Sequence, residues 1–261
     1  MVNHLVNKKL FTFVSTAFIY LILSHSVIGQ DIAQLATRAR DHLYDSWNFD
    51  SAAYYFDRVI EKRYAPAFAY SDYGWYLMLV DRYDEGLIYI ERAARMAPDD
   101  KQLVAWNSWA VLWTGDLPKA KQWIDKALAI DPEYGEAIHV GSRIASEMGH
   151  HQEALRLAEK AASNDPSWRG MIPLALAKGG HREKAVVWAE KIAKDENVFD
   201  VWLLLEVYAN LKDDEKALDY LQRSYELRYP FMPWLQHAPG LEHLHANPRF
   251  KDIVQKMNLP R

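Results

Sequence analysis

Histidines are the first candidates for chemistry, because two of them at the right spacing can hold a metal ion. His243 and His245 lie two positions apart. Residues at that spacing on a helix point to different sides, whereas helical zinc sites use a spacing of about four. His150 and His151 fall in an expected turn between helices. We therefore expect surface or capping histidines and no metal site.

Acidic pairs are the next candidates, because two carboxylates can share general acid and base work. Asp99 and Asp100, and again Asp213 and Asp214, directly precede expected helices, where N-capping and the helix dipole account for them. The sequence has no cysteine, no Gly-rich phosphate loop and no Gly-x-Ser-x-Gly turn. We therefore predict a protein that is not an enzyme and uses no cofactor.

Aromatic residues remain, since tryptophan offers a large flat surface and an N–H donor. The chain has ten Trp and fifteen Tyr, more than packing alone usually demands, and Trp75 and Trp109 lie 34 positions apart. With Trp106 and Trp113 they form a stripe that could recognise a ligand, with Arg143 beside it for a carboxylate or sulfate. The same stripe could instead fill the interior of a tightly curled superhelix.

The elements that would position this stripe repeat along the chain. Three similar segments end at Pro98, Pro132 and Pro166, so each step is 34 residues. Small residues, which let two helices approach closely, precede each proline at fixed positions: Gly86 and Ala93, Ala120 and Ala127, and Ala154 and Ala161. Each unit is thus expected to be a helix, a short turn, a second helix and a proline stop.

This 34-residue pattern resembles the tetratricopeptide repeat. The unit from Lys101 to Tyr134 matches the family's small, bulky and proline positions with Gly115, Ala120, Ile124, Ala127 and Pro132. It departs in the first helix, where the family's Trp, Leu, Gly and Tyr positions hold Val104, Asn107, Ser108 and Val111. The resemblance implies an all-α fold, a right-handed α-solenoid of tandem helix-turn-helix repeats with a C-terminal capping segment.

The array is expected over residues 30–229, as about six helix pairs that are most regular over residues 67–166. Beyond Pro166 the openings of the second helices, marked by Ala185 and Ala217, follow at steps of 31 and 32 residues. The proline-rich segment 230–261 breaks the period and is expected to cap the array without a function of its own. Asn247 should be the N-cap and Pro248 the first residue of its last helix.

In the family that this chain resembles, the first helix of each repeat lines the concave face through its positions 2, 5, 9, 12 and 13. We predict a ligand-binding site that combines this face with the tryptophan stripe. Its residues are Trp75, Met78, Trp106, Trp109, Trp113, His139 and Arg143. The predicted function is a scaffold that binds a protein or peptide partner. The alternative is a module that binds a glycan or the cell wall. The net charge of −4 and the lack of a basic run argue against nucleic acid.

The first 29 residues have the pattern of a secretory signal. They contain no acidic residue, and two lysines precede the apolar run from Leu10 to Leu23. Cleavage before Gln30 would leave Val27 and Gly29 at the positions that favour small residues. We predict an exported, periplasmic protein with no stable membrane insertion after cleavage. Secretion, or an uncleaved segment that anchors the chain, is the alternative.

Overall fold

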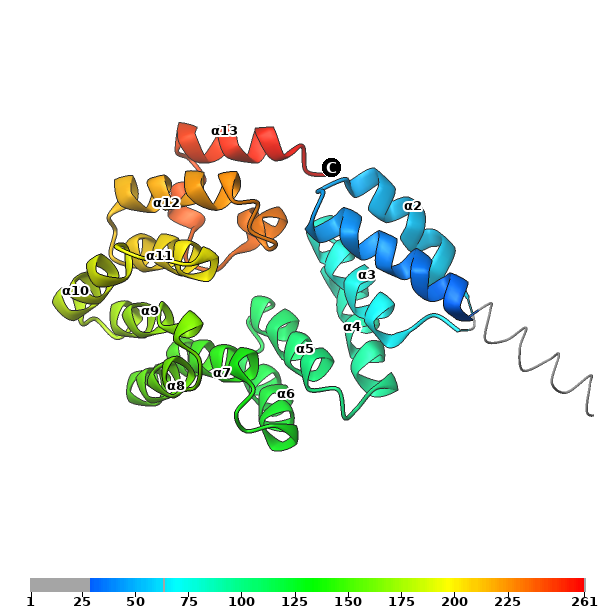
Figure 1. Ribbon diagram of the computed structural model, residues 1–261, viewed down its shortest axis with the longest axis horizontal. Helices are drawn as coiled ribbons and strands as arrows, with labels where there is room; N and C mark the ends of the chain where they lie inside the picture. The colour runs from blue at the N-terminus through cyan, green and yellow to red at the C-terminus, as the bar shows by residue number, and fades with distance from the viewer. Residues whose placement is uncertain (1–28, 63, 261) are drawn as a thin grey trace, which may run out of the picture.

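The structure is a computed structural model that describes residues 29–62 and 64–260. Every regular element in these two ranges is a helix, so the all-α prediction is confirmed. The helix of residues 29–44 comes first, and the helices then follow in successive pairs (Figure 1). The first helix pairs with α2 (Phe49–Ile60); the later pairs are α3 (Ala67–Leu79) with α4 (Tyr83–Met96), α5 (Lys101–Trp113) with α6 (Leu117–Ile130), α7 (Gly135–Glu147) with α8 (His151–Asn164), α9 (Met171–Lys178) with α10 (Arg182–Ile192), and α11 (Val198–Asn210) with α12 (Asp214–Glu226).

The signal segment predicted for residues 1–29 lies outside the described ranges except for its last residue, Gly29. Within those ranges, no helix is both long enough and apolar enough to cross a membrane. The described residues are therefore those of the helical array and the C-terminal segment.

The three regular repeats begin and end where the sequence places them. Their first helices start at Ala67, Lys101 and Gly135, at the predicted first position of each unit. The turn glycines Gly115 and Gly149 adopt φ values of +83° and +77°, a left-handed conformation that other residues rarely adopt. Periodicity and turn chemistry thus agree in this part of the chain.

Small residues set how closely the helices of a pair approach. A Cβ atom placed on Gly86 of α4 would lie 2.6 Å from the backbone oxygen of Gly74 in α3. At the position of Gly74, the next two repeats carry Ser108 and Ser142, whose buried hydroxyls donate hydrogen bonds to backbone oxygens of the second helix, at 2.6 and 2.8 Å. The departure from the family's glycine is therefore accommodated by a hydrogen bond across each pair.

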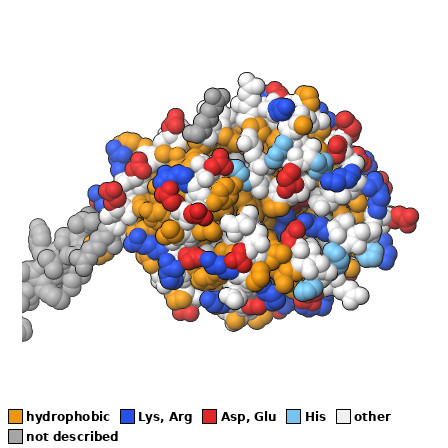
Figure 2. Space-filling view, turned by 180° about the vertical axis from the view of Figure 1, so that it is seen from behind, with side chains coloured by type: hydrophobic (Ala, Val, Ile, Leu, Met, Phe, Trp, Pro, Cys, Tyr) orange, Lys and Arg blue, Asp and Glu red, His pale blue; other side chains and the backbone are white. Residues whose placement is uncertain are grey.

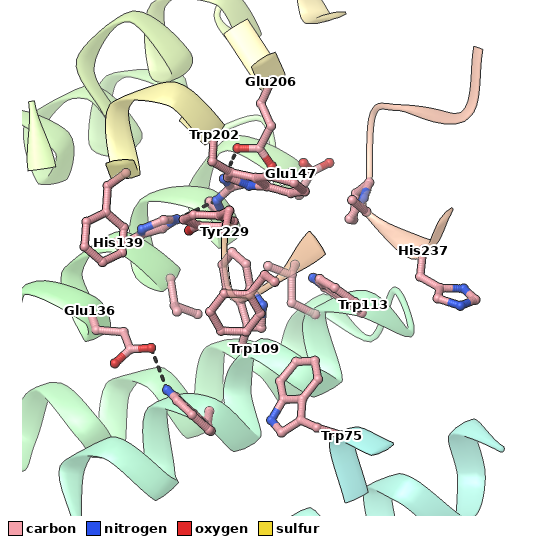
Figure 3. Close-up of a pocket in the computed structure, with 18 of the residues that line it drawn as sticks. Trp75, Trp109, Trp113, Glu136, His139, Glu147, Trp202, Glu206, Tyr229 and His237 are labelled. Carbon is pink, nitrogen blue, oxygen red and sulfur yellow. Dashed lines mark hydrogen bonds and ion pairs between the residues drawn. The ribbon is translucent and has the colours of Figure 1, made fainter. Parts of the chain in front are cut away.

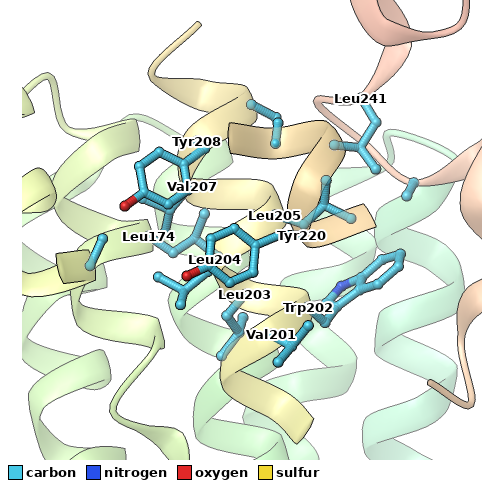
Figure 4. Packing of buried hydrophobic residues seen from close by; sticks show 14 of the residues in the cluster. Leu174, Val201, Trp202, Leu203, Leu204, Leu205, Val207, Tyr208, Tyr220 and Leu241 are labelled. Atoms are coloured by element: carbon cyan, nitrogen blue, oxygen red, sulfur yellow. The ribbon is translucent and has the colours of Figure 1, made fainter. Parts of the chain in front are cut away.

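The later repeats are irregular because their first helices are displaced. After α8 the chain makes a short 3-10 helix, η1 (Pro166–Trp168), and α9 has 8 residues where α7 has 13. The next first helix, α11, is buried on almost all sides, from Asp200 to Ala209 (Figure 4). A helix that is mostly apolar on all sides belongs inside a core, and α11 packs against α9 and α12.

The C-terminal segment returns to the beginning of the array. It contains η2 (Met232–His237), η3 (Glu242–Leu244) and α13 (Pro248–Met257), whose C-terminal end lies beside the first helices (Figure 1). As predicted, Asn247 is the N-cap of α13, accepting a hydrogen bond from the backbone N–H of Arg249 at 2.9 Å. The expectation of a cap alone was too narrow, because Trp234 of η2 is fully buried against Tyr44, with ring centroids 5.5 Å apart. The segment therefore joins the two ends of the array into a ring.

Candidate functional site

The concave side of the ring encloses a cavity of about 410 Å³. Its lining comes mainly from α3, α5, α7 and α11, from η1, and from the C-terminal segment, so elements far apart in the sequence contribute (Figure 3). A volume of this size is typical of sites for small ligands. It holds one or two side chains, and a folded domain is far too large for it.

Eight rings surround the cavity in a closed circuit, which we call the aromatic belt. Each ring contacts the next with centroids between 5.2 and 6.3 Å apart, and the last contacts the first. In order, the belt consists of Trp75, Trp113, Trp109, His139, Trp168, Phe199, Tyr229 and Phe231. All eight contacts are tilted or edge-to-face, and aromatic pairs prefer such geometries to a face-to-face stack.

The belt exists because residues distant in sequence are brought to one inner surface. Trp75 and Trp109 occupy the same position of successive first helices, and Trp113 lies one turn after Trp109. Tyr229 and Phe231 follow the last helix pair, in the segment that closes the ring. Without that closure the circuit would be open between Phe199 and Trp75.

One cation, Arg143, lies in the wall of the cavity and is fully engaged by the chain. Its Nε–H donates to Nε2 of His139 at 2.6 Å, its Nη2 pairs with the buried carboxylate of Glu206, and it lies 5.0 Å from the ring centroid of Trp109. Burial, reinforced by this positive charge, holds the pKa of His139 well below its ordinary 6.5. The carboxylate that the sequence led us to expect from a ligand of Arg143 is supplied by the protein itself.

Glu136 faces the same cavity in a different setting. It accepts hydrogen bonds from Nε1–H of Trp106 at 2.5 Å and from the hydroxyl of Tyr134 at 2.7 Å. Burial raises the pKa of Glu136, and these two hydrogen bonds lower it by less. Both partners are neutral, so no positive charge within the described ranges balances this carboxylate.

Two further carboxylates, Glu147 and Glu242, lie in exposed positions among the lining residues. Lys178 forms an ion pair with Glu147, and Glu242 accepts a hydrogen bond from the backbone N–H of Gly240 at 3.0 Å. Burial lowers the pKa of His237, another lining residue, whose Nε2 lies 3.8 Å from a carboxylate oxygen of Asp81. Elsewhere, the face seen in Figure 2 shows acidic and basic side chains interspersed, without a patch of one sign.

Comparison with known proteins identifies the fold. No protein-family model and no curated protein matches the sequence. A tetratricopeptide repeat protein from Parabacteroides merdae is 11% identical with a TM-score of 0.63, covering 87% of this chain and 84% of its own. The chain has the tetratricopeptide-repeat fold.

Two further solved structures with this fold extend the comparison. PilW, described as a widely conserved type IV pilus biogenesis factor, is 15% identical with a TM-score of 0.56, covering 88% of this chain and 98% of its own. The pilF protein of Pseudomonas aeruginosa is 12% identical with a TM-score of 0.55, covering 87% and 98%. Likeness at this level of identity concerns the fold alone.

Six of the seven site residues predicted from the sequence line the cavity of this tetratricopeptide-repeat fold. They are Trp75, Trp106, Trp109, Trp113, His139 and Arg143. Trp75 nevertheless has no exposed surface, and Met78 is fully buried against Gly86 and does not reach the cavity. The stripe is therefore partly core and partly cavity wall, and Met78 belongs to the core.

Several lining residues escaped the sequence reasoning, although a signal for three of them was present. The rule that places positions 2, 5 and 9 of each first helix on the concave face gives Phe199, Trp202 and Glu206 when it is counted from Val198. The rule failed there because the shortened repeats lost the register. Trp168, Tyr229 and Phe231 lie outside the paired helices, and no repeat position identifies them.

Proposed function

We propose that this protein is a non-catalytic scaffold that binds a segment of a partner protein by enclosing one of its side chains in the cavity. The observation that carries the proposal is the aromatic belt around a cavity of about 410 Å³. Aromatic side chains provide large contact area at low entropic cost and dominate binding energy in protein interfaces. Concave surfaces of helical repeats are the usual binding surfaces of such proteins.

We also propose that this binding takes place after export to the periplasm. The support is the signal-like pattern of the first 29 residues. N-terminal sequencing of the protein recovered from the cell envelope should show a chain that begins at Gln30. Recovery of a chain that retains residues 1–29 in the membrane fraction would replace export by an uncleaved anchor.

Pull-down from the native envelope fraction tests the binding proposal. Trp109→Ala and Trp113→Ala should each reduce capture of the partner by about tenfold or more, because central aromatic residues carry most interface energy. Trp123→Ala is the matched control, since Trp123 lies in α6 outside the cavity, with Nζ of Lys126 4.1 Å from its ring centroid. It should leave capture unchanged.

Circular dichroism and thermal melting of the same variants establish that they remain folded. If an alanine variant unfolds, Trp113→Phe replaces it, because the smaller ring fills part of the same space. Folded cavity variants that capture the partner as well as the unaltered protein does would overturn the proposal. Retardation by a soluble polysaccharide in affinity electrophoresis, abolished by Trp113→Ala, would replace the peptide by a glycan.

A further inference from the structure

We propose that the cavity selects a positively charged side chain of the partner, an ammonium or a guanidinium group, and places it between Glu136 and the aromatic belt. This inference rests on the proposed function, because it names the chemical class of the group that the scaffold encloses. Three features support it: the charge balance of the cavity, the pairing of fully buried carboxylates elsewhere in the chain, and the electrostatics of the cavity's rings.

The charges of the lining do not cancel. Arg143 is committed to Glu206 from within the wall, and Lys178 is committed to Glu147 at the edge. Glu136 has no cationic partner among the residues that the structure describes, whereas Glu242 is exposed and has His243 and His245 as its electrostatic neighbours. The lining therefore presents uncompensated negative charge, and a cationic group is the complement that it lacks.

Two fully buried carboxylates of this chain, Asp72 and Asp200, show how such a group is balanced by a cation. Asp72 of α3 pairs with Arg40 of the helix of residues 29–44 at 2.7 Å, and Asp200 of α11 pairs with Arg169, which follows η1, at 3.0 Å. Glu136 is half-buried at the start of α7 and accepts hydrogen bonds only from an indole N–H and a phenol. A cation from outside the chain would give Glu136 the partner that the other two carboxylates have.

The rings add a preference of the same sign. The face of an aromatic ring carries a negative electrostatic potential and attracts cations, most strongly when the ring is tryptophan. The cavity already shows this contact, because the guanidinium of Arg143 lies 5.0 Å from the ring centroid of Trp109. Trp113 and Trp168 line the cavity without a cation over their rings in the described part of the chain. An anionic group would meet both the ring faces and Glu136 unfavourably.

Titration of the full chain with capped amino acids tests the charge preference directly. The probes are lysine, arginine, norleucine and glutamate, each with an N-terminal acetyl and a C-terminal methylamide group, and binding is followed by tryptophan fluorescence. The lysine and arginine probes should bind about tenfold or more tightly than norleucine, which keeps the aliphatic chain and lacks the charge. The glutamate probe should not bind. Equal binding of lysine and norleucine probes would overturn the inference.

Glu136→Gln assigns the effect to one residue. It keeps an acceptor for the Trp106 N–H, so the fold should persist, and it should weaken the lysine probe by about tenfold while norleucine is unaffected. Glu133→Gln is the matched control, because Glu133 is exposed, lies just before α7 and pairs with Lys160 outside the cavity. An unchanged affinity of Glu136→Gln for the lysine probe would contradict the inference.

The two proposals can fail separately. If partner capture depends on Trp113 but is unaffected by Glu136→Gln, the proposal of a binding scaffold is supported and the proposal of a cationic side chain is wrong. If the lysine probe binds in a manner that depends on Glu136, but no partner is captured through Trp113, the cavity selects a cation and the proposal of a binding scaffold is wrong. Tetramethylammonium serves as a free organic cation in the same titration. Binding of tetramethylammonium about tenfold tighter than the lysine probe would overturn the assignment to a side chain.

Discussion

Trp234 donates a hydrogen bond from its indole N–H to the backbone oxygen of Trp75 at 2.9 Å, across 159 positions of sequence. Both side chains are fully buried, and their ring centroids lie 5.8 Å apart. The C-terminal segment is therefore part of the core of the first repeats. Because Phe231 completes the aromatic belt three residues earlier, the same contact that closes the ring also holds the cavity together.

Removal of Trp234 should open the ring. Trp234→Ala should lower the free energy of unfolding by about 3–5 kcal/mol, since it creates a large void in a packed core. It should also increase the radius of gyration in small-angle X-ray scattering, as the C-terminal segment leaves the first helices. Trp188→Ala is the control, because Trp188 lies half-buried in α10, away from the closure. An unaltered radius of gyration for Trp234→Ala would contradict this role.

The contact between Gly74 and Gly86 should tolerate no side chain. Gly86→Ala would place a Cβ atom 2.6 Å from the backbone oxygen of Gly74, so it should destabilise the protein by about 2–3 kcal/mol in urea unfolding. Gly141→Ala is the control within another helix, since its nearest contact would be 3.7 Å, to Leu157. It should stabilise by about 0.5–1 kcal/mol, because alanine favours the helix. A similar loss in both variants would show that backbone approach is not the cause.

The regular part of the fold could be predicted because its signals are local. The prolines, small residues and turn glycines between Ala67 and Pro166 recur with a fixed period, and each acts on the nearest helix pair. The closure of the ring could not be predicted in this way. Trp234 reaches Tyr44 and Trp75 through packing across the whole molecule, and no spacing in the sequence records such a contact.

The residues of the candidate site likewise divide into those that local periodicity predicts and those that depend on long-range packing. Trp109, Trp113 and Arg143 were found because they occupy regular first helices, and they line the cavity. Glu206 was missed because displaced helices broke the register, and Arg143 was therefore assigned to a ligand although the chain provides its partner. Met78 shares the periodicity of the stripe but faces the neighbouring helix, which periodicity alone could not distinguish from the concave face.

Loss of one member of the buried pair of Arg143 and Glu206 should destabilise the protein strongly, whereas replacement of both by apolar residues should destabilise it little. Arg143→Met and Glu206→Leu should each destabilise the protein by about 3–5 kcal/mol, because each leaves one uncompensated charge in the interior. The double variant should recover most of that loss, since it removes both charges. Equilibrium unfolding in urea measures all four proteins.

An exposed ion pair provides the comparison for this cycle. Lys121 and Asp125 of α6 are 2.8 Å apart, with side chains that are 50% and 56% exposed. Replacement of either should change the free energy of unfolding by less than about 1 kcal/mol. Additive losses in the double variant of Arg143 and Glu206 would show that the two side chains stabilise the fold independently.

Asp72 should make stability depend on pH in a direction opposite to most carboxylates. Burial raises its pKa from 3.8 to about 6 in the folded protein, although Arg40 offsets part of this shift. The folded state therefore holds the proton more tightly than the unfolded chain. The stability that this provides is present below about pH 4 and is lost as the pH rises through about 6. In urea unfolding, the free energy of unfolding of Asp72→Asn should rise relative to that of the unaltered protein across this window, by on the order of 3 kcal/mol.

Asp131 provides the control of opposite sign for this measurement, and the contrast between the two residues is the decisive result. A hydrogen bond from Lys101 lowers the pKa of Asp131. Its contribution is therefore present above the unfolded pKa and is lost as the pH falls. Asp131→Asn should become relatively less stable as the pH rises towards about 4, whereas Asp72→Asn becomes relatively more stable as the pH rises from about 4 to about 6. If the difference between Asp72→Asn and the unaltered protein does not vary between about pH 4 and 7, the pKa of Asp72 is not raised in the folded state.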